Sequence, residues 1–497
     1  MRWGEWRRDV PASLVVFLVA LPLCVGIAVA SGVPVELGLV TGVVGGLVVG
    51  VMPGSSLQVS GPAAGLTVLV AEAVERYGLA GLGTIVLVAG LLQIGLGLLR
   101  LGRWFRAISV AVVHGMLTGI GLLLVAGQFH VLAGADTPPT GLAGFTGLPA
   151  LAGELTGSVT AQVSLAVGAA TLVVMLLWDR LPGRPGLVPG ALVAVVATAV
   201  ASAALGLPVD TITVAGMLAA LTPSLGHWTA LTDPGMLATT VTFALVASAE
   251  SLFSAAAVDR MHQGPRTDFD RELVAQGTGN TVCGLLGALP MTAVIVRSSA
   301  NVRAGARTKA SRVLHGVWLL LFVAAVPGLV GLIPMPALAA VLVHAGCKLL
   351  PWRALPGLWR EHRGEAVVLV VTAVAILGTD LFTGVLVGLG LAVVKTAWET
   401  SHVRVAVRDD VDPVHVAITG NATFLRLPTI LATLDALPDD RTVRLDLGGL
   451  RHVDHACRTA LDSWIATHNG RADVCVHVVA PRPAEDDRPR PVVPATE

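Results

Sequence analysis

Long apolar runs separated by short polar stretches dominate the chain from about residue 12 to about residue 399. A helix needs about 20 predominantly apolar residues to cross a bilayer, and runs close to that length recur throughout this region. We therefore expect an α-helical polytopic membrane protein. The pattern predicts about fourteen crossing segments, near 12–30, 37–52, 61–75, 79–98, 107–128, 161–178, 187–206, 235–257, 272–288, 292–303, 313–333, 337–350, 365–378 and 382–398.

The placement of lysine and arginine supports an even number of crossings, because these residues favour cytoplasmic loops. With the basic N-terminus inside, alternation places the clusters around Arg260 and Arg303 inside as well. The long loops near 129–160 and 207–234 then lie outside, and they contain neither lysine nor arginine. Only Arg76 lies on the unexpected side. We predict a multi-pass protein of the cell (plasma) membrane with both termini in the cytoplasm.

Two segments are unusual and occupy matching places, the third and the tenth. The third contains QVSGPAAG at 58–65, and the tenth contains PMTAVIVRSSAN at 290–301. Each begins with an extended, β-prone stretch and continues as a helix, and Pro62 suits the first turn of its helix, where a missing N–H costs nothing. Broken segments at corresponding positions of two halves point to inverted repeats with a binding site at their interface. The alternative is that glycine and proline are simply common in membrane helices.

Arg297 is a charge inside an apolar run that is broken by Pro290, with no acidic residue nearby in sequence. A guanidinium in hydrocarbon is costly, so it must face protein, water or a ligand. Beside the start of a helix it would hold a small anion, because helix N-termini carry positive potential and free N–H groups. Ser60 and Ser298 would add hydroxyl donors or serve only as helix caps. The alternative is an arginine that reaches the headgroups from a helix end.

Glu250 is the second charge out of place, near the middle of the predicted eighth segment. A carboxylate inside the membrane is by default a candidate for carrying protons or cations. Glu250 with Ser254, one helical turn away, would alternatively hold a sodium ion. Two further alternatives remain open, a fixed ion pair with Arg297 and a position at the membrane interface.

The glycines between Gly42 and Gly50 follow no phosphate-loop pattern. Small residues at such spacing let membrane helices approach closely, and we expect them to do so here.

After about residue 403 the pattern changes to that of a small soluble α/β domain. Strands are expected from Val414, Val443 and Val474, and helices over 425–437 and 456–468, which predicts a sheet with helices on one side. We place the membrane domain at 1–402, the soluble domain at 403–480 and a disordered tail rich in proline and acid at 481–497. His452, Asp454, His455 and Cys457 lie close together in sequence, but they lack the spacing of a zinc site, and we expect no metal.

Composition narrows the classes of function. The chain is 54% hydrophobic and 13% charged with a formal net charge of +0, which gives no basis for binding nucleic acid. Its 5 cysteines show no paired spacing, which argues against a disulfide framework and fits a tail in a reducing cytosol. No nucleophile–base constellation indicates an enzyme, and we expect no cofactor beyond a coupling proton or sodium ion.

These residues together resemble the SulP family of sulfate permeases and bicarbonate transporters over nearly the full length of the chain. The C-terminal domain resembles a short version of the cytoplasmic STAS domain that these proteins carry. The matching stretches are DVPASLVVFLVALPLCVGIAVASGVP from Asp9, GSSLQVSGPAAG from Gly54, ESLFSAAAVD from Glu250, RELVAQGTGN from Arg271, and the region from Leu289 that ends in NVRAGARTKAS.

The resemblance implies two inverted repeats of seven spans, divided into core and gate domains, in a protein that is usually dimeric and moves by an elevator mechanism. It implies an anion site between the third and tenth spans, where Arg297 matches a family arginine, and a proton- or sodium-coupling role for Glu250. We assign Ser254 to coupling as well. The residues that we assign to anion binding are Leu23, Ser60, Gly61, Pro62, Ala63, Val296, Arg297 and Ser298.

The chain departs from the family pattern at two places. Many members have glutamine directly after the proline of the first span, whereas this chain has Leu23 after Pro22, which makes the site poorer in polar contacts. Sulfate and bicarbonate therefore both stay open. In the STAS-like domain, His455 replaces the serine that related bacterial regulators phosphorylate next to the loop aspartate, here Asp454. We expect the domain to serve dimer contacts and intracellular docking.

The prediction is a secondary active transporter of a small inorganic anion, coupled to protons or sodium. One alternative is an uncoupled exchanger or channel of the same fold. Another is a nucleobase permease, although a neutral base needs no arginine. A membrane-tethered signalling protein, in which residues 403–497 do the work, belongs to a different class of function.

Overall fold

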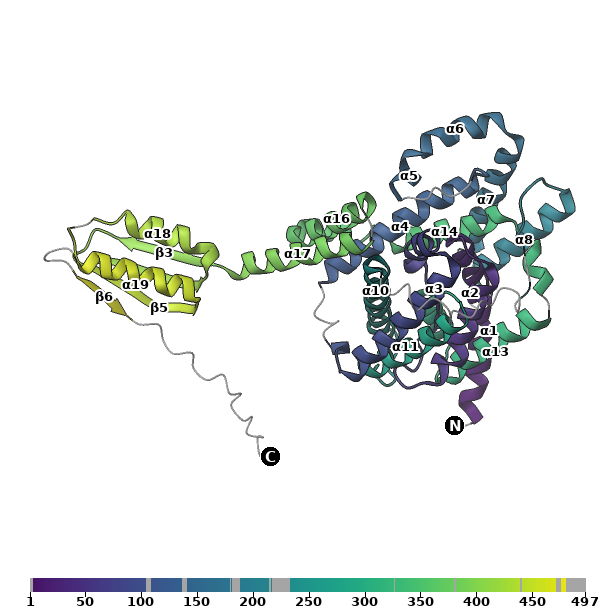
Figure 1. The fold of residues 1–497 in the computed structure, drawn as a ribbon, viewed down its shortest axis with the longest axis horizontal. Coiled ribbons are helices and arrows are strands. Elements are labelled where there is room, and N and C mark those ends of the chain that lie inside the picture. Colours follow the sequence, from purple (N-terminus) through teal and green to yellow (C-terminus); the bar gives the residue numbers. More distant parts are fainter. Residues whose placement is uncertain are drawn as a thin grey trace. The chain divides into compact units, whose positions relative to one another are not determined.

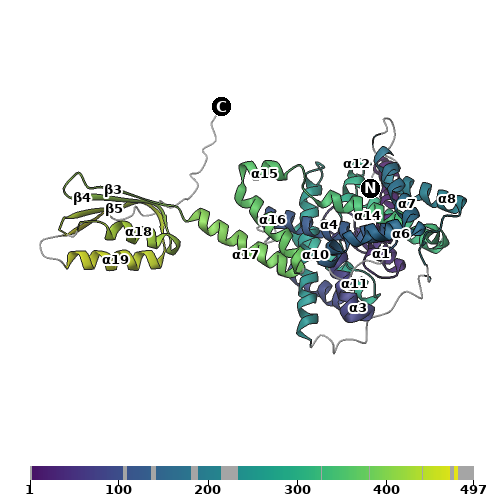
Figure 2. The same cartoon turned by 90° about the horizontal axis from the view of Figure 1, so that it is seen from above.

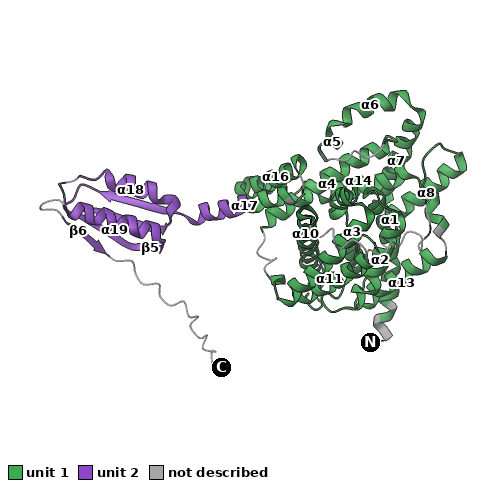
Figure 3. Ribbon diagram, in the orientation of Figure 1, with its two compact units in different colours: residues 1–389 green, residues 390–497 purple. Residues whose placement is uncertain are grey.

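The structure is a computed structural model that describes residues 3–103, 109–135, 141–178, 180, 188–213, 216, 233–325, 327–379, 381–438, 440–470 and 475–479. The tail at 481–497, predicted to be disordered, lies outside the described residues. The chain forms two compact units, residues 1–389 and residues 390–497 (Figure 3). Each unit is described by itself below.

A helix lies over every one of the apolar segments expected from the sequence (Figure 1). Within the described ranges, five helices are long and apolar enough to cross a membrane by length and composition, and the exact number of crossings stays a prediction. The helices are α1 (Trp3–Ala30), α2 (Val35–Leu47), α3 (Thr67–Leu98), α4 (Val110–Leu132), α7 (Val159–Trp178), α8 (Gly190–Leu205), α10 (Pro234–Asp259), α11 (Phe269–Leu285), α12 (Ile295–Arg303), α13 (Ala310–Ala325), α14 (Met335–Leu349), α16 (Arg363–Gly378) and α17 (Leu381–Thr400).

Helix α3 contains a break that divides it into the expected third and fourth segments. Gly78 has φ 70° and ψ 176°, which lies outside helical geometry. Only glycine adopts such a conformation readily, and an ideal Cβ at Gly78 would meet nothing within 4 Å. Glycine is therefore favoured at this residue by its backbone conformation and not by a lack of space for a side chain.

The region near 129–160, expected as a long loop, contains the helices α5 (Gly141–Thr146) and α6 (Leu148–Gly157). A further short helix, α15 (Leu355–Glu361), connects α14 with α16. The hydropathy pattern missed these helices because they are shorter than a membrane crossing.

The helices of the first unit pack through several pairs. Helix α3 packs against α10 and α11, and α13 packs against α1 and α2, whereas α4 packs against α14 and α16, and α7 against α8 and α14. Helices α2 and α13 meet at two glycines: an ideal Cβ on Gly46 would lie 2.5 Å from the Cα atom of Gly316. The prediction that the glycines after Gly42 permit close helix approach is confirmed at this crossing.

The second unit contains a four-stranded sheet of order β3-β4-β5-β6, formed by Val403–Arg408, Val414–Ala422, Val443–Val453 and Val476–Val479. Strand β3 pairs antiparallel with β4, and the other neighbours pair in parallel. Helices α18 (Leu427–Asp435) and α19 (His455–Asn469) cover one face of the sheet (Figure 2), as expected. The sequence did not predict β3, the antiparallel edge strand.

Buried apolar side chains on alternate positions of the strands join the sheet to its helices. Val416, Leu445 and Ile430 are each 0% exposed and belong to one core cluster. This alternation explains why the strands were recognisable from their sequence.

Asp454 stabilises the start of α19. Its carboxylate accepts hydrogen bonds from the backbone N–H of Cys457 at 2.8 Å and from the backbone N–H of Phe424. Partial desolvation alone would raise the pKa of Asp454, but these hydrogen bonds lower it on balance. A carboxyl whose pKa is lower in the folded state stabilises that state above its unfolded pKa of about 3.9. That stabilisation is lost as pH falls through the lower, folded pKa.

We predict that Asp454→Ala destabilises α19 by about 1 kcal/mol, because the helix loses its N-cap. Hydrogen exchange of peptides from residues 455–469 in the full-length protein measures this. Asp462→Ala, on the exposed face of the same helix, should leave exchange near the wild-type rate. Equal protection in wild type and Asp454→Ala at neutral pH would contradict the prediction.

Candidate functional site

Two short, buried strands from the two halves of the membrane unit pair with each other. Strand β1 (Ser60–Pro62) runs antiparallel to β2 (Met291–Ala293), with Gly61 opposite Thr292. Each strand leads into a helix: β1 into the 3₁₀ turn at residues 64–66 and then α3, and β2 into α12. The expectation of an extended stretch followed by a helix is confirmed for both segments.

The position expected for Pro62 was wrong. It is the last residue of β1, opposite Met291, and the helical turn begins at Ala64. Proline suits this position because β1 is an edge strand that needs no further N–H donor there.

Helix α12 begins with N–H groups that have no partner inside the helix. The first helical bond runs from the N–H of Ser298 to the carbonyl of Val294. The N–H groups of residues 295–297 are therefore left over, as at any helix start, and they give this end a positive potential.

A cavity of about 90 Å³ lies beside the two helix starts. Of the predicted site residues, Leu23, Val296, Arg297, Glu250 and Ser254 line it. Ser60, Gly61, Pro62, Ala63 and Ser298 lie in the adjoining strands and helix start but do not line it. The described residues that line it are Leu23, Ile27, Ala64, Gly65, Val113, Met116, Leu117, Glu250, Phe253, Ser254, Val294, Ile295, Val296, Arg297, Ala345 and Leu349.

Arg297 is fully buried, at 0% exposure. Its Nη2 donates to the carbonyl of Pro62 at 3.3 Å, and the thiol of Cys24 lies beside the guanidinium. Its Nε and Nη1 have no hydrogen-bond partner among the described residues. The side chain therefore does not reach toward headgroups, and it holds two unused donors next to the cavity.

Glu250 does not pair with Arg297. Among the described residues no ion pair joins either side chain to an opposite charge. Thr292 lies within hydrogen-bonding reach of the Glu250 carboxylate, while Oε2 of Glu250 has no described partner. The alternative of a fixed ion pair is therefore not what this structure contains.

Each of the two charged side chains lies against a glycine of the third segment, Gly61 within β1 or Gly65 in the turn before α3. An ideal Cβ on Gly61 would lie 2.0 Å from Nη1 of Arg297, and one on Gly65 would lie 2.7 Å from Oε1 of Glu250. Any larger residue at these positions would have to displace the charged group.

The hydroxyl groups of Ser60 and Ser298 are engaged within the protein. Ser60 accepts a hydrogen bond from Gln276 at 2.7 Å. Ser298 donates to the carbonyl of Val294 and accepts from the N–H of Val59. In this structure both serines hold the strands in place.

One face of α11 fixes both broken segments through three buried polar side chains spaced four residues apart. Glu272 accepts from the N–H of Ser55 at 2.7 Å, and Gln276 donates to Ser60. The side chain of Asn280 accepts from the N–H of Met291 at 2.7 Å and donates to its carbonyl at 3.1 Å. This polar face of α11 supports β1 and β2 from behind.

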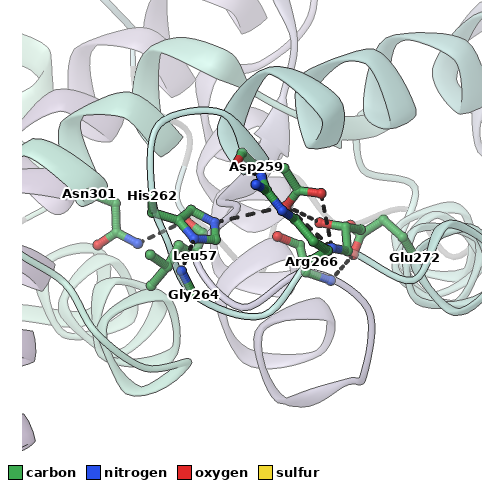
Figure 4. Close-up of polar contacts among 9 residues, drawn as sticks. Leu57, Asp259, His262, Gly264, Arg266, Glu272 and Asn301 are labelled. Carbon is green, nitrogen blue, oxygen red and sulfur yellow. Dashed lines mark hydrogen bonds and ion pairs between the residues drawn. The ribbon is translucent and has the colours of Figure 1, made fainter. Parts of the chain in front are cut away.

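The connection between α10 and α11 holds the two helices in register. Asp259, the last residue of α10, accepts hydrogen bonds from the backbone and hydroxyl of Thr267 and faces His262 at 3.9 Å (Figure 4). Arg266 donates to the carbonyl of Asp259. In the same view, Asn301 of α12 donates to the carbonyl of Leu57 at 2.9 Å. The first contacts fasten the α10–α11 connection to the end of α10, and the last fastens α12 to the stretch before β1.

A larger cavity of about 500 Å³ shares Leu23, Val296 and Ala345 with the small one. The basic side chains of Arg303, His344 and Lys348 line it, together with apolar residues and Gly190, and no carboxylate is among its described lining residues. An anion that approaches through it meets positive charge before it reaches the small cavity.

Sequence reasoning missed Cys24, Thr292, Gly65 and the polar face of α11. The first three carry no local signal, because their role depends on which distant segment they meet. Glu272, Gln276 and Asn280 did carry one, since polar residues repeated every four positions on a buried helix must find partners.

Comparisons with known proteins agree with this arrangement. A model described as the sulfate permease family matches residues 6–372. The chain is 26% identical to the putative sulfate transporter YvdB of Bacillus subtilis, over 94% of this chain and 91% of that one. It is also 26% identical to the bicarbonate transporter BicA of a Picosynechococcus species, over 80% of this chain and 71% of that one.

Two solved structures share the fold. The transmembrane domain of a cyanobacterial BicA superposes with a TM-score of 0.67 at 24% identity, over 79% of this chain and 98% of that one. The murine anion transporter Slc26a9 in its inward-facing state gives a TM-score of 0.76 at 15% identity, over 96% of this chain and 86% of that one.

We predict that Gly61→Ala and Gly65→Ala weaken anion binding but cost little stability. Each new methyl group meets the flexible end of a charged side chain and not backbone, so Arg297 or Glu250 moves instead of the fold. The measurement is the thermal-unfolding midpoint of detergent-purified protein with and without added anion. Gly95→Ala, in the α3 helix that follows and with nothing within 4 Å of its ideal Cβ, is the control. A loss of anion-induced stabilisation in the control as well would contradict this explanation.

We predict that Asn280→Ala destabilises the protein by roughly 2 kcal/mol, because the N–H and carbonyl of Met291 lose their partners in a buried site. Thr278→Ala on the same helix removes only a bond to its own helix carbonyl at Val274 and should cost much less. Thermal unfolding of both variants tests this, and equal midpoints would exclude a special role for Asn280.

Proposed function

Because the chain belongs to the sulfate permease family, we propose that it is a secondary active transporter of a small inorganic anion of the sulfate or bicarbonate class. The observation that carries the proposal is Arg297, a buried guanidinium with two unused donors beside a cavity in the membrane unit. A buried cation with unused donors is costly unless an anion neutralises its charge and accepts its hydrogen bonds.

The position of the site supports this reading. The cavity lies beside the starts of two helices from opposite halves of the unit, and helix starts attract anions. The planar fork of Arg297 suits the oxygens of an oxyanion. A neutral nucleobase would leave the charge of Arg297 uncompensated, so a nucleobase permease is the weaker candidate.

We propose that Glu250 carries the coupling ion. Its carboxylate borders the same cavity as Arg297 without pairing with it, and Oε2 is free among the described residues. A proton on this carboxylate would neutralise it. A sodium ion would take oxygen ligands from Glu250, Thr292 and Ser254, the residue types that such ions prefer.

The anion would reach the site from the larger cavity, whose basic lining includes Arg303 and Lys348. We propose elevator-type alternating access in the cell membrane, in which β1, β2 and their supporting helices move together. The polar face of α11 supports movement as one body, since it fastens both strands to a single helix. The C-terminal unit would act as a cytoplasmic STAS-like domain in a homodimer.

We predict that Arg297→Ala lowers anion uptake into proteoliposomes at least about 30-fold, the kinetic equivalent of about 2 kcal/mol for a lost buried charge. Uptake of labelled sulfate and of labelled bicarbonate is measured with an imposed proton or sodium gradient. Arg307→Ala, at an exposed position beyond the same helix, controls for loss of a surface charge. Uptake that survives Arg297→Ala would remove this residue from the binding site.

Glu250→Gln distinguishes coupled transport from uncoupled exchange. We expect the variant to lose the acceleration that the cation gradient gives, because a neutral amide neither takes up a proton nor neutralises sodium. The measurement is the ratio of uptake rates with and without the gradient. An unchanged ratio above one would assign coupling to another residue. Equal rates with and without the gradient in the wild type would favour an exchanger or channel.

A further inference from the structure

We infer that the small cavity selects a singly charged anion, such as bicarbonate, over doubly charged sulfate. The inference rests on the proposed function and adds the charge class of the substrate. It follows from the charges, the donors and the size of the cavity, taken in turn.

The formal charges of the described residues that line the cavity sum to zero when Glu250 is ionised. Among the described residues that line it, Arg297 is the only cation and Glu250 the only anion. Ser254 is the only other polar side chain, and the remaining lining is apolar or glycine. Without a coupling ion, the two charged groups therefore cancel.

A coupling cation changes this sum by one unit. With a proton or a sodium ion on Glu250, that group becomes neutral and the charge of Arg297 remains. A singly charged anion then brings the loaded site to zero formal charge, whereas sulfate leaves one negative charge. The helix starts add local positive potential, but a dipole adds no net charge.

A net charge on the loaded site is costly, because in the proposed transport cycle the site moves through surroundings of low dielectric constant. The cost of desolvating an ion rises with the square of its charge, so it is about four times larger for a dianion of similar size. In a cavity of about 90 Å³ a bound anion keeps little of its own water. Both effects act against sulfate.

The number of available donors acts in the same direction. Arg297 offers Nε and Nη1, while its Nη2 already donates to Pro62. Ser60 and Ser298 are not among the described lining residues, and the hydroxyl of Ser298 already donates to the carbonyl of Val294. Sulfate has four acceptor oxygens, and those that face Val296 or Leu23 would stay without a hydrogen bond. Bicarbonate has three oxygens, one of them protonated, and therefore needs fewer donors than sulfate.

The test is uptake of labelled bicarbonate and of labelled sulfate by the full-length protein in proteoliposomes, at equal ionic strength and with the same cation gradient. We expect kcat/KM for sulfate to be roughly 100-fold lower than for bicarbonate. Unlabelled nitrate or formate should compete with bicarbonate better than unlabelled sulfate does.

Two variants at Leu23, which lines both cavities, separate charge from hydrogen bonding. Leu23→Lys adds one positive charge and should raise sulfate uptake at least tenfold over the wild type. Leu23→Gln adds donors without charge and should raise it less. The wild-type selectivity decides the question even if a variant does not fold.

Each outcome has a distinct meaning. Bicarbonate uptake that depends on Arg297, with slow sulfate uptake, supports the inference. Sulfate uptake as fast as bicarbonate uptake, and lost in Arg297→Ala, overturns the inference but leaves the proposed function intact. Uptake of neither anion overturns both.

Discussion

A guanidinium buried in the membrane unit without a paired carboxylate constrains much of the surrounding structure. Arg297 is 0% exposed, and only one of its nitrogens makes a hydrogen bond that the structure describes, to the carbonyl of Pro62. That carbonyl is available because β1 stays extended as far as Pro62. The guanidinium fits because residue 61 has no side chain. The broken geometry of the third segment is thus the condition under which the membrane unit accommodates this charge.

The broken geometry in turn needs support, since short strands in a membrane protein expose backbone groups that water cannot satisfy. Helix α11 supplies that support from one polar face, with Glu272 on the loop before β1, Gln276 on β1 and Asn280 on β2. These buried polar groups are tolerable because they satisfy backbone groups of the strands. The site is therefore held in place by α11 as well as by the pairing of the two segments that carry it.

The separation of Arg297 from Glu250 decides what the site can do. If the two charges were paired, neither would be free to bind an ion. Here each keeps an unused polar atom beside one cavity of about 90 Å³. In the function that we propose, an anion and a coupling cation bind close together without displacing a contact within the protein. The apolar walls make each of them dependent on the few polar groups present, which is the physical origin of the charge selectivity that we infer.

The sequence by itself determined the helical segments, the two broken segments and the unusual charges of Arg297 and Glu250. These are local features: apolar run length, the β-prone stretches around Gly61 and Thr292, and charges inside apolar runs can all be read along the chain. The order of β4, α18, β5, α19 and β6 was readable for the same reason. Only the tertiary structure decided that Pro62 ends a strand, that β3 joins the sheet edge, and that Gly61 and Gly65 lie against Arg297 and Glu250. It also placed Thr292 and Cys24 beside those charges. These facts depend on contacts between segments far apart in the chain, and no local pattern encodes which distant segments will meet.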